Sequence, residues 1–483
     1  MQITKPHAVL LASPGMGHLI PVLELGKRLV THQDFHVTVF VVAVDVSGEN
    51  ISKLLDSSSE HLDVLMLPTV DISGIVDPDE NFVIKIVVTM HESLSAIRSA
   101  ICGMKIRPTA LIVDLFGTEA MAIADELEML KYVFIASNAW FLAATIYGPA
   151  VDKKVLDDEH INQKKPLKIP GCTPIRFEDT LEAFLDPNDP LYHGYLSVGR
   201  VIPTADGILV NTWEDLESKT LRALKDDKLL GCVARTTVYP IGPLARAVEA
   251  VAENQVLEWL DMQPTESVIY VSFGSGGTLP SKQMMELAWG LEQSQQRFIW
   301  VVRPPLENDV SGSFLTVGNG PVGTVDYLPN GFMNRTHNVG LVVPMWAPQA
   351  QILEHPSVGA FLSHCGWNST LESIVSGVPM IAWPLYAEQK MNATMLTEEI
   401  GMSVRSRELP TERIVEREEI EMMVRRVMVM DKERHAMKNK VKELKNSALK
   451  ASSKGGSSYN SLSQLTKDCE NRFQCLKVKA EGG

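Results

Sequence analysis

Residues 346–389 combine residue types that bind anionic ligands around one expected strand-to-helix junction. The apolar run GAFLS predicts a buried strand that ends just before His364, and residues 367–373 should open a helix. Asn, Ser and Thr are typical of helix N-termini, where unpaired N–H groups and the helix dipole attract negative charge. A diphosphate would therefore fit at this junction, with His364, Asn368 and Ser369 as hydrogen-bond donors.

Two other side chains of this segment fit the remaining parts of a nucleotide. Glu372, further along the expected helix, would accept a hydrogen bond from a ribose hydroxyl, and Trp346 offers a flat face for a stacked base. The pair His364 and Cys365 also suggests a metal site, but no further ligands stand at metal-binding spacing. We therefore expect no metal, and we interpret Cys365 as a small buried residue at the strand end.

A second junction of chemical interest reads SPGMGHLIP, residues 13–21. His18 follows two glycines where a strand should lead into a helix, so it belongs to a phosphate-binding turn, a helix cap or a catalytic site. Taken alone, a tight turn explains the stretch more simply, because it lacks the third glycine of the dinucleotide-binding GxGxxG pattern. Asp114, which ends the apolar run ALIVD, is by itself most simply a strand-end carboxylate.

The composition restricts the class of protein. A chain of 483 residues exceeds one ordinary core, so two domains of roughly 200–250 residues are expected. Hydrophobic residues make up 45% and charged residues 22%, as in ordinary globular proteins. The formal net charge of −14 repels nucleic acid and anionic membranes, so neither is an expected partner.

The sequence also indicates a cellular compartment. Polar residues follow Met1 where a signal peptide would be apolar, and no apolar run approaches the ~18 residues of a membrane span. The six cysteines are scattered without a CxxC pair, which favours reduced thiols. We therefore expect a cytoplasmic protein without membrane insertion, acting as a monomer.

Short apolar runs alternate with helical patterns in both halves of the chain, which is typical of a parallel sheet covered by helices. In the first half the predicted strands are residues 7–13, 37–42, 110–114, 132–136 and 207–211. In the second half they are residues 268–272, 298–302, 341–343, 359–363 and 380–383. Two such units imply two facing α/β domains, with ligands bound where the carboxyl ends of the strands meet a cleft.

The predicted domain limits follow from a Pro- and Gly-rich break at residues 239–244. We expect one domain over residues 1–244 and a second over residues 256–460, joined by a linker at residues 245–255. Residues 461–483 should form a helical tail that returns to the first domain.

The 346–389 segment resembles, along its whole length, the nucleotide-sugar box of plant secondary-product glycosyltransferases, with Trp, Pro-Gln, HCGWNS, Glu and the final Glu-Gln in place. The resemblance extends over almost the whole chain and includes SPGMGH, LIVDLFG, GILVNTWEDLE, YPIGPL and YVSFGSGGTL. Within plant family 1 UDP-glycosyltransferases, it is closest to the subgroup that glucosylates monolignols and other phenylpropanoids, or hydroquinone-type phenols. It implies the GT-B fold, two Rossmann-like doubly wound domains facing across a cleft, the first binding the acceptor and the second the UDP-sugar.

The resemblance also implies a UDP-sugar site. By this match, uracil would be bound by Trp346 and Ala347, and the ribose by Gln349 and Glu372. The diphosphate would be bound by Ser275, His364, Asn368 and Ser369, and the glucose by Trp367, Glu388 and Gln389. The final Gln is associated in the family with UDP-glucose, whereas Glu388 stands where Asp is commoner.

In this family the histidine of the first strand–helix turn is the general base, and an aspartate after a later strand orients it; His18 and Asp114 match these positions. A phenol, with a pKa of ~10, is mostly neutral at pH 7, so removal of its proton during attack lowers the barrier. A carboxylate on the other ring nitrogen fixes the tautomer and stabilises the imidazolium. A helix N-terminus can stabilise the departing UDP, so no metal or other cofactor is expected.

The acceptor pocket is less clearly marked in the sequence. Phe116 and Leu115, next to the dyad aspartate, are candidates for packing on an acceptor ring. Ser137 would donate to the glucose, and Trp140 would reshape the pocket, because ASNAW at residues 136–140 departs from the Pro-Thr-Asn-Ala-Arg type of the closest relatives.

The resulting hypothesis is an inverting, UDP-glucose-dependent O-glucosyltransferase that forms β-glucosides of small phenolics, such as coniferyl or sinapyl alcohol or aldehyde. Coumarins, flavonoids and hydroquinones are the alternative acceptors. Two other classes were weighed. A nicotinamide oxidoreductase is disfavoured by the absent GxGxxG, and a non-catalytic UDP-sugar-binding protein by the intact His18 and Asp114.

Overall fold

A computed structural model describes residues 5–42, 60–77, 80–151, 153–246, 248, 254–306, 327–408 and 413–481. The chain divides into two compact units, Met1–Leu244 with Ala448–Gly483, and Ala245–Ser447. The sequence had assigned residues 448–460 to the second domain, but the structure groups them with the first unit, because the division falls within the long helix α17 (Asp431–Ser452). The expected linker at residues 245–255 lies partly outside the described residues.

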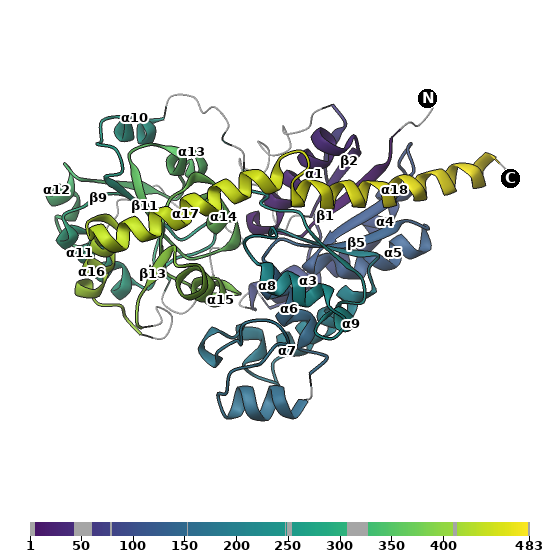
Figure 1. Ribbon diagram of the computed structural model, residues 1–483, viewed down its shortest axis with the longest axis horizontal. Coiled ribbons are helices and arrows are strands. Elements are labelled where there is room, and N and C mark those ends of the chain that lie inside the picture. The colour runs from purple at the N-terminus through teal and green to yellow at the C-terminus, as the bar shows by residue number, and fades with distance from the viewer. Residues whose placement is uncertain are drawn as a thin grey trace. The chain divides into compact units, whose positions relative to one another are not determined.

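The first unit is built on a sheet that includes β1, β2 and β5 (Figure 1). Its described strands are parallel and follow the order β3-β2-β1-β4-β5-β6-β7. The strands are β1 His7–Ala12, β2 His36–Val41, β3 Leu62–Met66, β4 Ala110–Asp114, β5 Leu130–Ile135, β6 Gly207–Val210 and β7 Thr237–Pro240. The strand order reverses between β1 and β4. In doubly wound sheets ligands bind at the carboxyl ends of the strands at such a reversal.

Helices cover the faces of this sheet, so the central strands are nearly continuous apolar runs. The helices are α1 Met16–Gln33, α3 Phe82–Glu92, α4 Leu94–Cys102, α5 Met121–Glu126, α6 Ala139–Tyr147, α7 Pro190–Val201, α8 Ser218–Lys225, α9 Gly231–Ala234 and α18 Ser457–Glu481. Helical segments of other types are the 3-10 helices η1 Leu115–Ala120, η3 Phe177–Asp179, η4 Glu182–Phe184 and η5 Ile202–Thr204 and the π-helix η2 Lys154–Asn162.

The C-terminal helix α18 packs on α1 and β7 of the first unit. Leu462 and Leu465 are fully buried in the core of this unit, and the Tyr239 hydroxyl donates to Asp468 at 2.9 Å. Residues 462–469 thus contribute to the first unit's core.

The second unit repeats the plan, with described strands in the parallel order β10-β9-β8-β11-β12-β13. The strands are β8 Val268–Ser272, β9 Arg297–Val302, β10 Gly340–Pro344, β11 Val358–Ser363, β12 Met380–Ala382 and β13 Ser403–Arg405. The helical segments are α10 Gln255–Asp261, α11 Ser281–Ser294, α12 Phe332–Thr336, α13 Gln349–Glu354, α14 Trp367–Ser376, α15 Gln389–Thr394, the π-helix η6 Met395–Ile400, α16 Arg417–Met428 and most of α17. Here the order reverses between β8 and β11.

The two-domain α/β architecture expected from the sequence is confirmed. Three strands were not predicted, namely β3, β7 and β13. All three are edge strands of the described sheets, and β7 lies where the sequence indicated a Pro-rich break, because its last residue, Pro240, is tolerated at a sheet edge.

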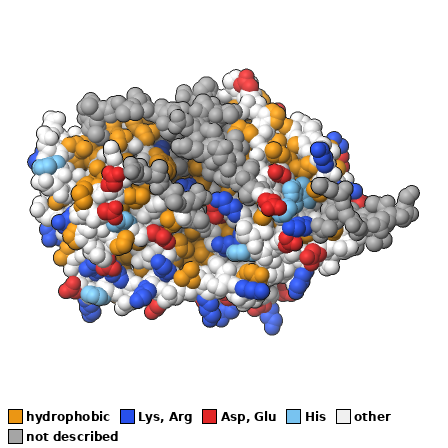
Figure 2. All heavy atoms as spheres, turned by 90° about the horizontal axis from the view of Figure 1, so that it is seen from above, with side chains coloured by type: hydrophobic (Ala, Val, Ile, Leu, Met, Phe, Trp, Pro, Cys, Tyr) orange, Lys and Arg blue, Asp and Glu red, His pale blue; other side chains and the backbone are white. Residues whose placement is uncertain are grey.

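Within the described part of the chain, no helix combines the length and the apolar character that a membrane crossing requires. On the face drawn in Figure 2, acidic and basic side chains are interspersed. The described residues of that face therefore form no continuous basic stripe of the kind that follows a nucleic-acid backbone.

The stability of the first unit should depend on His7, at the start of β1. The ring is buried and contacts the Thr38 hydroxyl at 2.9 Å, and burial together with the nearby His36 lowers the pKa of His7 to about 4. The unfolded chain takes up this proton near pH 6.5 and the folded chain does not. Stability is therefore present above pH 6.5 and lost as the pH falls towards 4, by about 1.4 kcal/mol at pH 5.5.

Melting temperatures of the unmodified chain, His7→Gln and the exposed control His337→Gln, measured at pH 7.5 and 5.5, test this. We expect a smaller acid-induced drop for His7→Gln than for the other two proteins. Equal drops in all three would contradict the assignment.

Candidate active site

The carboxylate of Asp114 is held at the carboxyl edge of the first sheet by its neighbours. The pairing of β1 with β4 sets Leu11 beside Val113, so the next residues meet at the same edge. Asp114 is 1% exposed; it accepts hydrogen bonds from the Ser13 backbone N–H at 3.0 Å, the Ser13 hydroxyl at 2.5 Å and the Gly117 N–H at 3.1 Å. The carboxylate is therefore fixed in orientation by three hydrogen bonds.

The structure brings His18 to this carboxylate. Helix α1 starts after Gly15, whose φ of 105° suits a residue without a Cβ, and this turn directs the ring of His18 towards β4. His18 Nδ1 lies 3.2 Å from Asp114 Oδ2, although the ring is turned so that Nδ1 makes no well-aligned hydrogen bond. The side chain is 19% exposed, so this histidine is oriented by a buried carboxylate and still reached by solvent.

The acceptor-pocket candidates fall into two groups. The Phe116 ring meets His18 edge-on at a centroid distance of 5.2 Å and is half-buried, whereas Leu115 and Ser137 are buried. Trp140 is 1% exposed, and its indole N–H donates to the carbonyl of Thr173 at 3.0 Å. Only Phe116 is therefore placed beside the dyad by a ring contact, and Trp140 belongs to the core.

Glu217 explains the position of Trp140, and sequence reasoning missed it. This buried carboxylate caps the N-terminus of α6 by accepting from the N–H groups of Ala139 and Trp140, each at 2.9 Å. Asn138 caps the same helix by accepting from Phe141 at 2.8 Å. The only sequence signal was an acidic residue in GILVNTWEDLE, distant along the chain.

In the second unit, α14 begins after β11, at the junction singled out in the sequence. The helix starts at Trp367, and its N-cap residue Gly366 provides no side-chain acceptor for the first turn. No acidic side chain stands in that turn either. An anion at this end would thus meet backbone N–H groups without competition from a side-chain cap.

His364 is enclosed at this junction by two glycines. A Cβ atom on Gly274 would lie 2.6 Å from the imidazole, and one on Gly366 would also collide with it. Burial, followed by the charge of Arg303, lowers the pKa of His364 to about 4. The imidazole is therefore neutral at ordinary pH and offers one N–H donor.

The residues expected to face ribose and uracil form one cluster. The Gln349 amide donates to the Ser369 hydroxyl at 2.9 Å and to Glu372 at 2.6 Å. Trp346 is 51% exposed, whereas the neighbouring Ala347 is buried. A large exposed aromatic ring beside a polar cluster suits base stacking.

The residues expected to bind the sugar lie at the start of α15, after β12. Gln389 is buried, and its side-chain oxygen accepts from the N–H groups of Leu385 at 2.9 Å and Tyr386 at 3.1 Å. Glu388 accepts from Asn392 at 3.5 Å. The oxygen of Gln389 thus shapes the preceding loop, so a ligand would be recognised by its amide nitrogen.

Trp367 and Ser275 complete the expected set. Trp367 is buried at the start of α14, and Ser275 is half-buried in the turn after β8. Strands β8 and β11 are neighbours in the sheet, so Ser275 and His364 both follow strands that flank the reversal of strand order.

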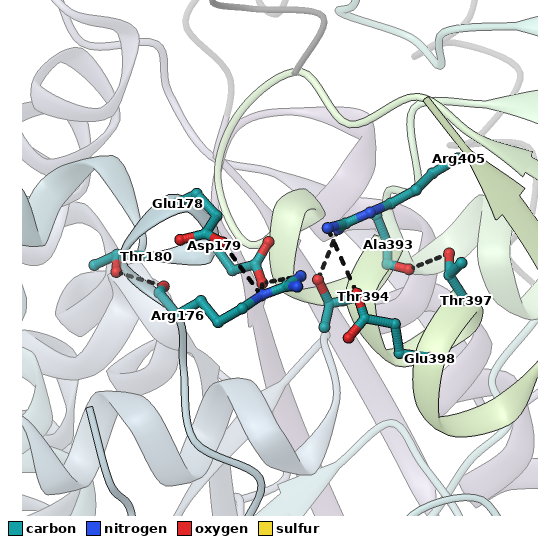
Figure 3. Close-up of polar contacts among 9 residues, drawn as sticks. All are labelled: Arg176, Glu178, Asp179, Thr180, Ala393, Thr394, Thr397, Glu398 and Arg405. Carbon is teal, nitrogen blue, oxygen red and sulfur yellow. Dashed lines mark hydrogen bonds and ion pairs between the residues drawn. The ribbon is translucent and has the colours of Figure 1, made fainter. Parts of the chain in front are cut away.

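Figure 3 shows polar contacts that stabilise a segment in each unit, each considered separately. Arg405 of β13 donates to the Thr394 hydroxyl at 2.8 Å and lies 3.6 Å from Glu398. These two contacts of Arg405 hold η6, the segment that follows α15 in the chain, against β13. In the first unit, Arg176 forms an ion pair with the buried Asp179 at 2.7 Å and fixes the turn η3.

Over the described ranges, no group of three or more His, Cys, Asp or Glu side chains is placed to hold a metal ion. The donor set at the α14 junction, one neutral imidazole with amide and hydroxyl groups, suits phosphate oxygens better than a cation.

Comparisons with known proteins were made on the sequence and on the fold. The profile of the family described as UDP-glucoronosyl and UDP-glucosyl transferase matches residues 252–428. Over 100% of both chains, the sequence is 53% identical to UDP-glycosyltransferase 72E1 of Arabidopsis thaliana. It is 54% identical to anthocyanidin 3-O-glucosyltransferase 5 of Manihot esculenta, covering 98% of this chain and 97% of the other.

Two solved structures are similar to this chain over nearly its whole length. TcCGT1 in complex with UDP superposes with a TM-score of 0.91 at 47% identity, covering 97% of this chain and 100% of the other. UGT2 of Phytolacca americana, complexed with UDP-2-fluoro-glucose and pterostilbene, gives a TM-score of 0.85 at 37% identity, covering 96% and 100%.

The neutral state of His364 can be measured directly. With ¹⁵N-labelled histidine, NMR should show the His364 imidazole uncharged from pH 8 down to pH 5, because its pKa of about 4 results from burial and from the charge of Arg303. His364→Gln identifies the signal, and the exposed His337 serves as the internal control. A midpoint near the ordinary value of about 6.5 would contradict the environment described.

Proposed function

The chain belongs to the UDP-glucoronosyl and UDP-glucosyl transferase family, within the plant UDP-glycosyltransferases, and we propose that it transfers glucose from UDP-glucose to the hydroxyl of a small phenol with inversion. The observation that carries this proposal is the contact of half-buried His18 with the buried, hydrogen-bonded carboxylate of Asp114. We assign acceptor activation to the first unit and donor binding to the second.

The dyad would act as a general base. With Nδ1 turned to Asp114, Nε2 is the nitrogen that takes the phenolic proton. The phenol oxygen then forms a bond to the anomeric carbon of glucose while the bond from that carbon to the diphosphate breaks, and UDP leaves with the electron pair. Attack opposite the leaving group converts the α-linked donor into a β-glucoside. Asp114 stabilises the imidazolium formed in this step.

Donor binding is proposed at the α14 junction and the loops around it. The N-terminus of α14, with Ser275, His364, Asn368 and Ser369, would hold the diphosphate, and Gln349 and Glu372 would hold the ribose. Trp346 and Ala347 would bind uracil, and Trp367, Glu388 and Gln389 the glucose. These neutral donors and the helix dipole stabilise the charge that UDP gains on leaving, so the reaction needs no metal.

For the acceptor we propose a phenylpropanoid alcohol or aldehyde of the coniferyl or sinapyl type. The Phe116 ring beside His18 favours a flat aromatic acceptor, because two aromatic rings pack in preferred orientations and Phe116 would orient the acceptor ring. A relative whose name specifies anthocyanidin 3-O-glucosylation and a similar structure that contains pterostilbene support phenols as the broader class. Flavonoids, coumarins and hydroquinones are therefore the acceptors to compare.

We also propose that the protein acts in the cytoplasm as a monomer. The described cysteines form no disulfide, and Cys365 and Cys469 are buried, with a pKa raised by burial to about 12 in each thiol. Such thiols remain protonated, so a reducing compartment suits them.

An acceptor panel tests the proposed function. Coniferyl alcohol, sinapaldehyde, a coumarin, a flavonoid and hydroquinone are each incubated with UDP-glucose and EDTA, and the products are identified by mass spectrometry and NMR. We expect β-O-glucosides, fastest with the phenylpropanoids and unaffected by EDTA. Release of UDP with none of the phenols would exclude the activity, and faster transfer to a flavonoid would overturn the acceptor assignment.

The assignment of the base has its own test. His18→Ala should lower kcat by about 10³-fold or more, while the affinity for UDP stays within about twofold, because the base does not hold the nucleotide. Isothermal titration and steady-state rates measure the two quantities. The matched control is His32→Ala, also on α1 but in its last turn, which should leave both unchanged. Turnover that survives His18→Ala would remove this residue from catalysis.

A further inference from the structure

Arg303 is a buried cation next to the proposed donor site, and neither the sequence motifs nor the proposed reaction uses it. It follows β9 directly, and the residue is only 6% exposed. One guanidinium nitrogen, Nη2, donates to the carbonyl of Met345 at 3.2 Å, whereas Nε and Nη1 are buried without a partner. Among the residues that the structure describes, no carboxylate forms an ion pair with it.

A charge in this position is costly. A guanidinium taken out of water without an ion pair or a full set of hydrogen bonds destabilises the folded state, and buried charges are normally paired. Burial accordingly lowers the pKa of Arg303, although an arginine stays protonated at any physiological pH. A negative ligand would provide the charge that the fold leaves out.

Three segments of the donor site converge on this side chain. Met345, whose carbonyl it holds, has a φ of 63° and immediately precedes the stacking residue Trp346. The charge of Arg303 also contributes to the lowered pKa of His364. Arg303 further lines a cavity together with Phe273 and Thr278, on either side of the turn that contains Ser275. These segments are the ones assigned above to the uracil and the diphosphate of the donor.

We propose that Arg303 is the fixed countercharge of the donor site, a positioning residue that favours a nucleoside diphosphate over an uncharged nucleoside and holds the backbone of Met345 in place. The inference rests on the donor site proposed above. It needs no direct contact with the ligand, because a charge in a poorly solvated site acts over several ångströms. The planar fork suits an arginine here, since Nη2 can stay on Met345 while Nε and Nη1 keep their donors unused by the described residues.

The experiment compares the binding of UDP and of uridine, which lacks the phosphates, by calorimetry or by competition. Arg303→Met should weaken UDP binding roughly tenfold to a hundredfold and uridine binding at most about threefold. Arg303→Lys keeps the charge and should retain the preference for UDP over uridine within about threefold. The control Arg297→Met removes a charge from the start of the same strand, where Nε donates to Gln263 at 3.1 Å, and should change neither ligand.

The outcomes separate the possible roles. Equal weakening of UDP and uridine by Arg303→Met, or no weakening at all, would overturn the proposal, since a purely structural role moves both ligands together. If Arg303→Met does not fold, as judged by thermal melting, Arg303→Lys decides the question, and loss of its preference for UDP would reject the countercharge. Failure of the unmodified chain to bind UDP would instead reject the donor site itself, and this inference with it.

Discussion

The parallel pairing of β1 with β4 is the constraint on which the rest of the first unit depends. It brings the turn after one strand and the last residue of the other to the same edge of the sheet, although they are about a hundred residues apart in the chain. The backbone and hydroxyl of Ser13 then bond to Asp114, which fixes the register at that edge. A slip by one residue would turn Asp114 to the opposite face of the sheet and leave His18 without its carboxylate.

The second unit has the same strand order at its centre but different side chains at the edge of its sheet. Its strand order also reverses between its first and fourth strands, β8 and β11, and the polar residues again follow these strands. In place of a rigid acid–base pair, this edge presents a helix N-terminus without a side-chain cap and an imidazole enclosed by glycines. The same strand order can therefore carry different chemistry in the two units, because the side chains at the strand ends differ.

Most of the strands were predictable from the sequence, and the strands and residues that were not predicted escaped for physical reasons. The central strands were predicted because burial on both faces makes them continuous apolar runs, whereas edge strands such as β3 alternate and escape that pattern. The site residues next to a strand end could be located from the motifs. Glu217 and Arg303 could not, because their roles depend on partners far along the chain, Ala139 in one case and Met345 in the other.

The two histidines of the strand ends show how environment decides chemistry. Both follow the carboxyl end of a strand at a reversal of strand order. His18 is partly exposed and lies 3.2 Å from the buried carboxylate of Asp114. His364 is buried, and burial followed by the charge of Arg303 lowers its pKa to about 4, so the ring stays neutral at ordinary pH. The first histidine is therefore accessible beside a carboxylate, as the proposed general base must be, and the second is neutral and able to donate a hydrogen bond.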